Sequence, residues 1–305
     1  MAKHTNDAIE LGCSKLPAIM GYSPWQTPND VLGIVRSAQA GTPVENKPNG
    51  FMNFGNYCEP GIRDWIRDEL GWEVAELLDA ERKGPPGLAA SLDGLVIAGH
   101  GITIVDTGGV AHILKGSGPL EIKTTSEEND EPMIGYQIQL QGQMLCSGTD
   151  WGVIVEVPRR RPQLRVHVIR KHWPTQQAII SAVADFWLRV KENRPYPPMN
   201  KADASALFPS ARAKATIDLS KNNEIGELVD SLDAAERAIA AAEEIKEKTE
   251  ARIMEILGEH EIGLLGDGRK VIWPMRSYKA QPEKITPAKP ARTIRLNTIE
   301  IKDAI

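Results

Sequence analysis

Two carboxylates and a lysine occur at spacings that could build a metal site. Asp93 directly precedes the glycine and apolar run at 94–97, and Glu121 and Lys123 alternate around Ile122. Successive side chains of a strand point to opposite faces, so Glu121 and Lys123 share one face. Hard divalent cations prefer oxygen ligands. The pattern therefore predicts that Asp93, Glu121 and the backbone carbonyl of Ile122 hold Mg²⁺ or Mn²⁺.

Such a site has the components needed for phosphodiester hydrolysis. A divalent cation lowers the pKa of a water molecule and clamps the leaving oxygen. Lys123, placed beside it, could orient the attacking water or offset charge that develops on a phosphoryl oxygen. The residue types therefore indicate hydrolysis of a phosphate ester.

The tripeptide Glu-x-Lys has no specificity by itself in this chain. It also begins at Glu45, Glu81, Glu244 and Glu300. The first two lie in loops, the third in an Ala-rich helical segment and the fourth in the last six residues. Glu121 differs because an Asp-Gly pair stands upstream of it in a neighbouring predicted strand.

Other motifs occur in a fixed order around this segment: Gly12-Cys13-Ser14 with the stretch 18–24, Phe54-Gly55-Asn56 with Glu59, and the glutamine-rich stretch 139–144. With them, the chain resembles the PD-(D/E)xK nuclease superfamily. More closely, it resembles the YqaJ-like viral recombinases related to phage lambda exonuclease. The matching motifs span roughly residues 11 to 157, about half of the chain.

The resemblance implies a fold and a set of catalytic residues. The fold is of the α/β (α+β) class, a restriction-endonuclease-like core with a mixed central sheet flanked by helices. The implied catalytic residues are Asp93, Glu121 and Lys123, with Glu59 as a further metal ligand. The residues themselves place Glu59 in the first turn of a helix, where the helix dipole alone would also favour a carboxylate.

The resemblance also implies a pocket for a terminal 5′-phosphate, formed by Ser14, Ser91, Gln141 and Gln139. Ser14 falls at a predicted helix start, where it could instead act only as a helix cap. A glutamine-rich helix at 133–147 could likewise be merely solvated. Lambda-type exonucleases carry an arginine before this serine motif, whereas residues 1–11 contain none. Lys3, Lys15 or a hairpin arginine could substitute for it.

A predicted β-hairpin, with strands at 151–157 and 164–169, carries the most basic segment of the chain at its tip. Arg159, Arg160 and Arg161 are consecutive there. They are candidates for salt-dependent contacts with the DNA backbone, and a solvated turn is the alternative.

Composition and length limit the remaining possibilities. The net charge of −5 excludes a uniformly basic DNA-binding surface, so a nucleic-acid site must be local. The three cysteines lack metal-ligand spacing, which indicates a reduced, cytosolic protein. The resemblance implies the cytoplasm of a bacterium or of a phage-infected host. No segment resembles a signal peptide or a membrane span. We expect a nuclease domain at 1–198, a linker at 199–220, and a long helix, a hairpin and a flexible tail at 221–305.

Three functions remain open at this stage. The first is a Mg²⁺-dependent 5′-to-3′ exonuclease on ends of double-stranded DNA, for which the resemblance implies a single-strand annealing protein as partner and a homo-oligomer, a trimeric ring. The second is a PD-(D/E)xK endonuclease or Cas4-like end processor, although the cysteine cluster of the latter is missing. The third is a non-catalytic DNA-binding module on the same fold.

Overall fold

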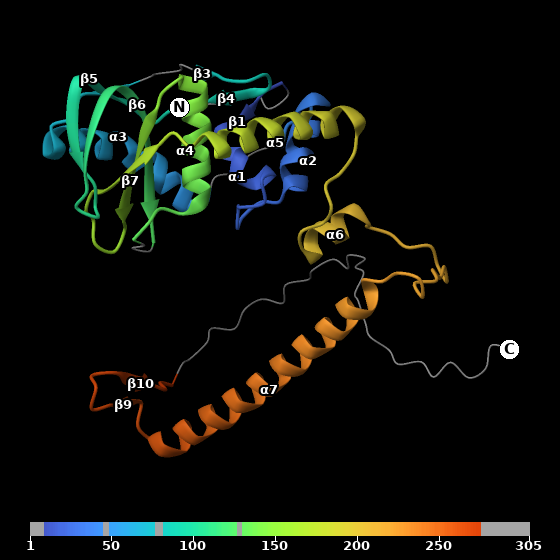
Figure 1. Cartoon of the computed structure of the whole chain (residues 1–305). Coiled ribbons are helices and arrows are strands. Elements are labelled where there is room, and N and C mark those ends of the chain that lie inside the picture. The colour runs from blue at the N-terminus through green and yellow to red at the C-terminus, as the bar shows by residue number, and fades with distance from the viewer. Residues whose placement is uncertain (1–8, 45–48, 77–81, 127–129, 276–305) are drawn as a thin grey trace. The chain divides into compact units, whose positions relative to one another are not determined.

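The computed structural model describes residues 9–44, 49–76, 82–126 and 130–275. The chain divides into two compact units, Met1–Leu207 and Phe208–Ile305. The first unit combines sheets and helices, and the second contains a long helix and a hairpin (Figure 1).

A five-stranded sheet forms the centre of the first unit, in the order β2-β5-β6-β7-β8. Its strands are β2 (Val74–Ala75), β5 (Gly94–Val105), β6 (Ala111–Thr125), β7 (Trp151–Pro158) and β8 (Arg165–Arg170). All neighbouring strands are antiparallel except β6 and β7, which are parallel and are joined through helix α4 (Ile134–Ser147). The mixed sheet expected from the sequence is therefore present.

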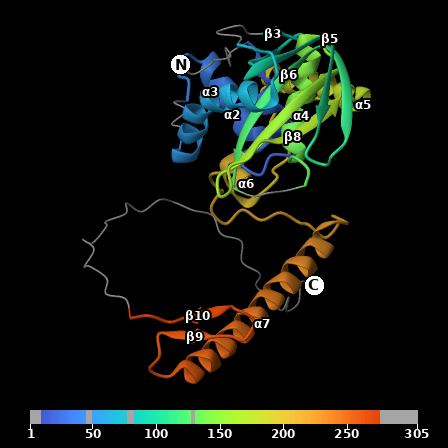
Figure 2. The same cartoon turned by 90° about the vertical axis from the view of Figure 1, so that its left-hand side faces the viewer.

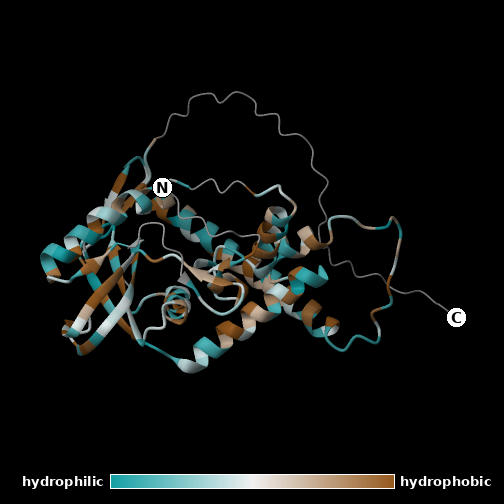
Figure 3. Cartoon of the chain, turned by 90° about the horizontal axis from the view of Figure 1, so that it is seen from above, coloured by the Kyte–Doolittle hydropathy of each residue, from teal (hydrophilic) through white to brown (hydrophobic). Residues whose placement is uncertain are grey.

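Helices cover both faces of this sheet, and hydrophobic residues run along its strands (Figures 1, 2 and 3). On β7 every residue is buried. Val153 and Val155 pack with Ile62 and Ile66 of helix α3 (Gly50–Leu70), whereas Ile154 packs with α4. Because side chains alternate along a strand, α3 and α4 lie on opposite faces.

A smaller sheet has the order β1-β4-β3, with β1 (Leu11–Gly12), β3 (Arg82–Lys83) and β4 (Leu88–Ala90). Strands β1 and β4 are parallel, and Gly12 lies opposite Ala89. Ser14 and Ser91 each follow two residues later, so both serines leave this sheet at the same end.

Helices pack around the two sheets: the 3₁₀ turn η1 (Cys13–Lys15), α1 (Leu16–Ile19), α2 (Pro28–Gln39), and α5 (Trp173–Glu192). Helix α3 begins earlier than the sequence predicts. Asn49 caps it by accepting from the Met52 N–H at 2.9 Å, and the helix continues through Pro60 to the left-handed cap Gly71. Glu59 therefore lies in the middle of α3 and not in its first turn, which corrects the sequence-based expectation.

The segment between Asp93 and Glu121 forms a hairpin as an extension of β5 and β6. Ile102 lies opposite Leu114 and Val105 opposite Ala111, with register shifts on either side of Gly99. His112 contacts Asp106 at 2.8 Å at the tip of this hairpin, away from the strand ends where Asp93 and Glu121 lie.

Part of the predicted linker is ordered on the first unit. Helix α6 (Lys201–Leu207) brings buried Asp203 to Asn29, whose amide donates to the carboxylate at 3.1 Å. Met199 N–H donates to the same carboxylate at 3.0 Å. The first unit therefore extends to residue 207.

The second unit contains α7 (Ile225–Leu257) and an antiparallel hairpin of β9 (Ile262–Leu264) and β10 (Lys270–Ile272). Both elements match the sequence-based expectation. The predicted flexible tail at 282–291 lies outside the described residues. Among the described residues, no helix is long and apolar enough to cross a membrane.

Candidate active site

Strand register brings Asp93 and Glu121 together. Asp93 directly precedes Gly94, whose partner on β6 is Leu120, so Asp93 lies beside the next residue of β6, Glu121. The Asp93 carboxylate accepts a hydrogen bond from the Ile122 N–H at 2.8 Å. The two carboxylates that sequence spacing singled out therefore lie side by side at one end of the central sheet.

Helix α4 holds Glu121 from one face of that sheet. Gln139 donates to one carboxylate oxygen of Glu121 at 2.8 Å, and Gln143 donates to the other at 2.5 Å. The ammonium of Lys123 lies 2.5 Å from Glu121 and 5.0 Å from the centre of the Tyr136 ring. Sequence reasoning missed Gln143, although its four-residue spacing from Gln139 places both amides on one helix face.

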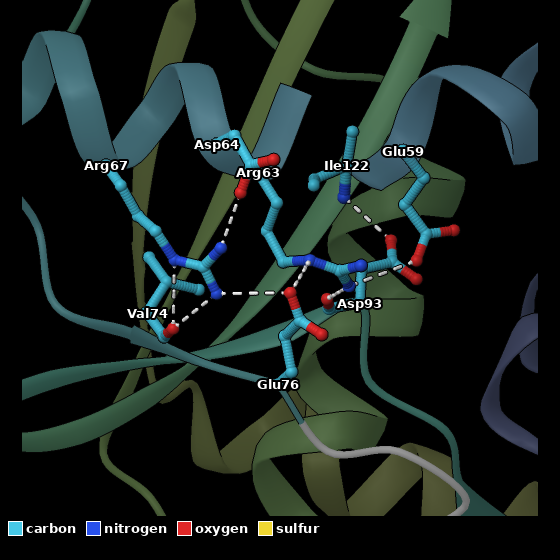
Figure 4. Close-up of polar contacts among 8 residues, drawn as sticks. All are labelled: Glu59, Arg63, Asp64, Arg67, Val74, Glu76, Asp93 and Ile122. Carbon is cyan, nitrogen blue, oxygen red and sulfur yellow. Dashed lines mark hydrogen bonds and ion pairs between the residues drawn. The ribbon is translucent and has the colours of Figure 1, made fainter. Parts of the chain in front are cut away.

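Glu59 and Arg63 approach the site from the opposite face, on α3 (Figure 4). The buried Arg63 guanidinium donates to the backbone carbonyl of Asp93 at 2.5 Å and lies 3.5 Å from Glu59. Its Nε atom is 3.5 Å from a carboxylate oxygen of Glu76. Sequence reasoning missed Arg63, for which the four-residue spacing from Glu59 was the available signal.

Burial, followed by crowding of negative charge, dominates the electrostatics of the site. Burial raises the pKa of Asp93, and the carboxylates of Glu121 and Glu59 raise it further, from its ordinary value of 3.8 to about 8, against the opposing effects of Lys123 and the Ile122 N–H. Burial lowers the pKa of Lys123. The carboxylates of Glu121 and Asp93 outweigh that effect and hold the Lys123 pKa above its ordinary value.

The donor set fits a hard divalent cation in chemistry. Its side-chain donors are carboxylate oxygens. The pKa of Asp93 is raised by burial and also by the neighbouring negative charge, which a cation would offset. Within the part of the chain that the structure describes, however, no three acidic, histidine or cysteine side chains are arranged to hold a metal as they stand. Glu121 comes from the α4 face and Glu59, beside Arg63, from the α3 face, with Asp93 between them.

The predicted phosphate-binding residues are only partly brought together. Ser14 is exposed and Ser91 half-buried at the same end of the small sheet. The Ser91 carbonyl accepts from Gln143 at 3.3 Å, which links it to the Glu121 site. Lys15 contacts Gln26, and Lys3 lies outside the described residues.

Gln141 contacts a different part of the fold from Gln139. It follows Gln139 by two residues, about 200° around the helix, so it points away from Glu121. Its amide donates to the Arg170 carbonyl at 2.7 Å and its oxygen accepts from the His172 N–H at 3.0 Å. Gln141 thus connects α4 to the end of β8 and lines a separate cavity of about 590 Å³.

The three hairpin arginines differ in environment. Arg159 is half-buried and its guanidinium lies 4.5 Å from the centre of the Phe51 ring on α3. Its N–H donates to the carbonyl of Thr125 at 2.9 Å, at the end of β6. Arg160 and Arg161 are exposed. Two of the three are therefore available for contact with a polyanion.

An Asp ahead of one strand and a Glu-x-Lys on its neighbour, at the end of a mixed sheet covered by helices, define a PD-(D/E)xK nuclease core. Residues 5–150 match the model of the YqaJ-like viral recombinase domain. This segment, just under half of the chain, is similar to the YqaJ-like viral recombinase domain.

Similar solved structures include LHK-Exo in complex with dAMP, with 20% identity, a TM-score of 0.48, and coverage of 66% of this chain and 96% of that chain. A second is an alkaline exonuclease (LHK-Exo) from Laribacter hongkongensis, with 22% identity, a TM-score of 0.47, and coverage of 65% and 95%. A third is a phage-related exonuclease from Haemophilus somnus 129PT, with 11% identity, a TM-score of 0.41, and coverage of 61% and 96%. No curated protein sequence matches significantly.

Proposed function

We propose that this protein is a Mg²⁺-dependent DNA exonuclease that degrades one strand of linear duplex in the 5′-to-3′ direction. The observation that carries the proposal is the meeting of Asp93, Glu121 and Lys123 at one sheet end, within a YqaJ-like domain. A nuclease fold used only for binding would not need the two carboxylates and the lysine together.

Asp93, Glu121 and the carbonyl of Ile122 would hold the cation, with Glu59 as a further carboxylate. Bound there, Mg²⁺, or Mn²⁺ in its place, supplies a Lewis acid for attack on the phosphodiester. Gln139 and Gln143 keep the Glu121 carboxylate in one orientation. Lys123 provides a positive charge beside the reacting phosphate and a donor that orients the attacking water.

The remaining contacts place a DNA end in this site. Ser14 and Ser91 supply hydroxyl donors for a terminal 5′-phosphate, supported by their shared position at the end of β1 and β4. Arg160 and Arg161 contact the duplex backbone without reading its sequence. The family match supports two further proposals: the exposed 3′ tail passes to a single-strand annealing protein, and the enzyme acts as a homo-oligomer.

The proposal is tested with linear duplex, nicked circle and covalently closed circle in Mg²⁺, using strands labelled at the 5′ or the 3′ end. Wild type should degrade linear duplex from its 5′ ends, faster with a 5′-phosphate, and leave closed circles intact. Asp93→Ala and Glu121→Ala should each reduce hydrolysis at least about tenfold, a loss of roughly 1.4 kcal/mol of transition-state stabilisation. Duplex binding in Ca²⁺ should persist in both variants.

Asp64→Ala is the matched control, because Asp64 is an exposed acid of α3 that pairs with Arg67. It should retain wild-type activity. Cleavage of closed circles would identify an endonuclease instead. Duplex binding without hydrolysis by the wild-type protein would identify a binding module.

A further inference from the structure

Arg63 is a buried cation that has no role in the hydrolysis proposed for Asp93, Glu121 and Lys123. It is 8% exposed, although it lies on a helix whose neighbouring Asp64 is exposed. Its guanidinium contacts three segments of the chain: Glu59 on its own helix, Glu76 after β2, and the backbone carbonyl of Asp93. The planar guanidinium can meet several acceptors in fixed directions, which a lysine ammonium cannot do.

Arg67, one turn further along α3, provides an internal comparison (Figure 4). It also contacts Glu76, at 3.3 Å, and it donates to the backbone carbonyl of Val74 at 2.8 Å. The structure records no contact of Arg67 with Glu59 or Asp93 among the described residues. The two arginines therefore bind α3 to the same region of the sheet, but only Arg63 reaches the site.

The contact of Arg63 with Asp93 is made to the main chain and not to the carboxylate. Arg63 fixes the carbonyl of the residue, while the Ile122 N–H orients its carboxylate. The same guanidinium lies beside Glu59, which comes from the other side of the sheet end. Arg63 thus connects Glu59 on α3 to Asp93 at the end of the sheet.

We infer that Arg63 is a positioning residue that sets the divalent-metal affinity of the site by holding Asp93 and Glu59 in fixed relative positions. The inference rests on the proposed function, since it concerns the same carboxylates. The positive charge of Arg63 alone would repel a divalent cation, but the carboxylates of Glu59 and Glu76 already offset that charge. Loss of the contact to Asp93 should therefore have the larger effect.

The test measures the affinity of the full-length protein for Mn²⁺ in the absence of DNA. Electron paramagnetic resonance reports the concentration of Mn²⁺ that remains free. Arg63→Met should bind Mn²⁺ roughly 10–100-fold more weakly than wild type, as expected when a residue that orients metal ligands is lost. Arg63→Lys should remain weakened, because it restores the charge without the planar donor set. Thermal denaturation curves identify a temperature at which every variant is folded, and Mn²⁺ binding is compared at that temperature.

Arg67→Met is the matched control. It should lose thermal stability and bind Mn²⁺ like wild type. Wild-type affinity in Arg63→Met, or recovery by Arg63→Lys, would overturn the positioning role and leave the proposed nuclease intact. If Arg63→Met does not fold, Arg63→Lys decides between these outcomes. Failure of the wild-type protein to bind Mn²⁺ would instead overturn the metal site itself, and the inference with it.

Discussion

At the scale of single residues, the site depends on negative charges held close together by neutral and cationic donors. The Glu121 carboxylate accepts hydrogen bonds from two side-chain amides and lies beside the Lys123 ammonium. The Asp93 carboxylate accepts from a backbone N–H, and the Asp93 carbonyl accepts from Arg63. Like charges in a partly desolvated place favour protonation of one of them. The raised pKa of Asp93 is the consequence, and it makes the metal-free protein sensitive to pH.

Asp93→Asn should therefore stabilise the metal-free protein at high pH more than at low pH. The folded pKa of about 8 exceeds the ordinary 3.8, so the folded state retains a proton that the unfolded chain has lost. Stability from this group is complete below about pH 4 and is lost as pH rises towards 8, at about 1.4 kcal/mol per pKa unit. The gap between variant and wild type should exceed about 1 kcal/mol near pH 8. Urea unfolding in EDTA at several pH values measures it, and parallel curves would show that Asp93 titrates normally.

At the scale of elements, the close packing of α4 on the N-terminal segment positions both halves of the site. Gly142 faces Leu16 and Cys13, and an added Cβ would overlap Leu16 and lie 3.1 Å from the Cys13 sulfur. The lack of a side chain lets η1, which carries Ser14, lie against the helix that carries Gln139. Packing at this contact therefore sets the distance between the proposed phosphate pocket and Glu121.

Gly142→Ala should destabilise the protein by about 1–3 kcal/mol, because the extra methyl group overfills a close contact. Gly33→Ala is the matched control on α2, where an added Cβ meets nothing within 4 Å. It should stabilise by about 0.5–1 kcal/mol through helix propensity. Urea unfolding of both variants distinguishes the two effects. Equal stabilisation would mean that α4 and α1 lie further apart than the structure shows.

At the scale of the whole molecule, the boundary of the first unit depends on a contact between distant parts of the chain. Asn29 of α2 donates to the carbonyl of Tyr196 at 3.0 Å and to Asp203 of α6 at 3.1 Å. The chain after α5 is thereby fastened to the start of the nuclease fold. A boundary placed by composition at residue 198 would cut through this contact.

A truncated protein ending at Leu207 should be more stable than one ending at Pro198. The shorter protein lacks Asp203, so its Asn29 amide loses a charged acceptor, at a cost of roughly 1.5–3 kcal/mol for a hydrogen bond to an ionised group. Thermal denaturation of the two proteins measures the difference. Asp203→Asn in the longer protein should reproduce much of the loss, and equal stability of all three would show that α6 is not anchored through Asp203.

Local sequence determined much of the fold, because periodicity and end signals act over a few residues. Helix α5 (Trp173–Glu192) has a local end signal of this kind, Asn193 in the left-handed conformation. The basic hairpin and the long C-terminal helix also follow from local patterns. The same applies to the Asp-Gly and Glu-x-Lys motifs, whose alternation predicted a shared site. Helix α3 is the local failure, because its cap at Asn49 and its path through Pro60 were missed.

The tertiary structure alone decided which side chains complete that site. The family resemblance placed Gln139 and Gln141 in one pocket. The orientation of α4 gives Glu121 the amides of Gln139 and Gln143 and turns Gln141 towards β8. Arg63 was likewise not distinguishable from Arg67 on its helix. Their difference arises from where Asp93 lies across the sheet end, and that position depends on strand register and helix packing between segments far apart in the chain.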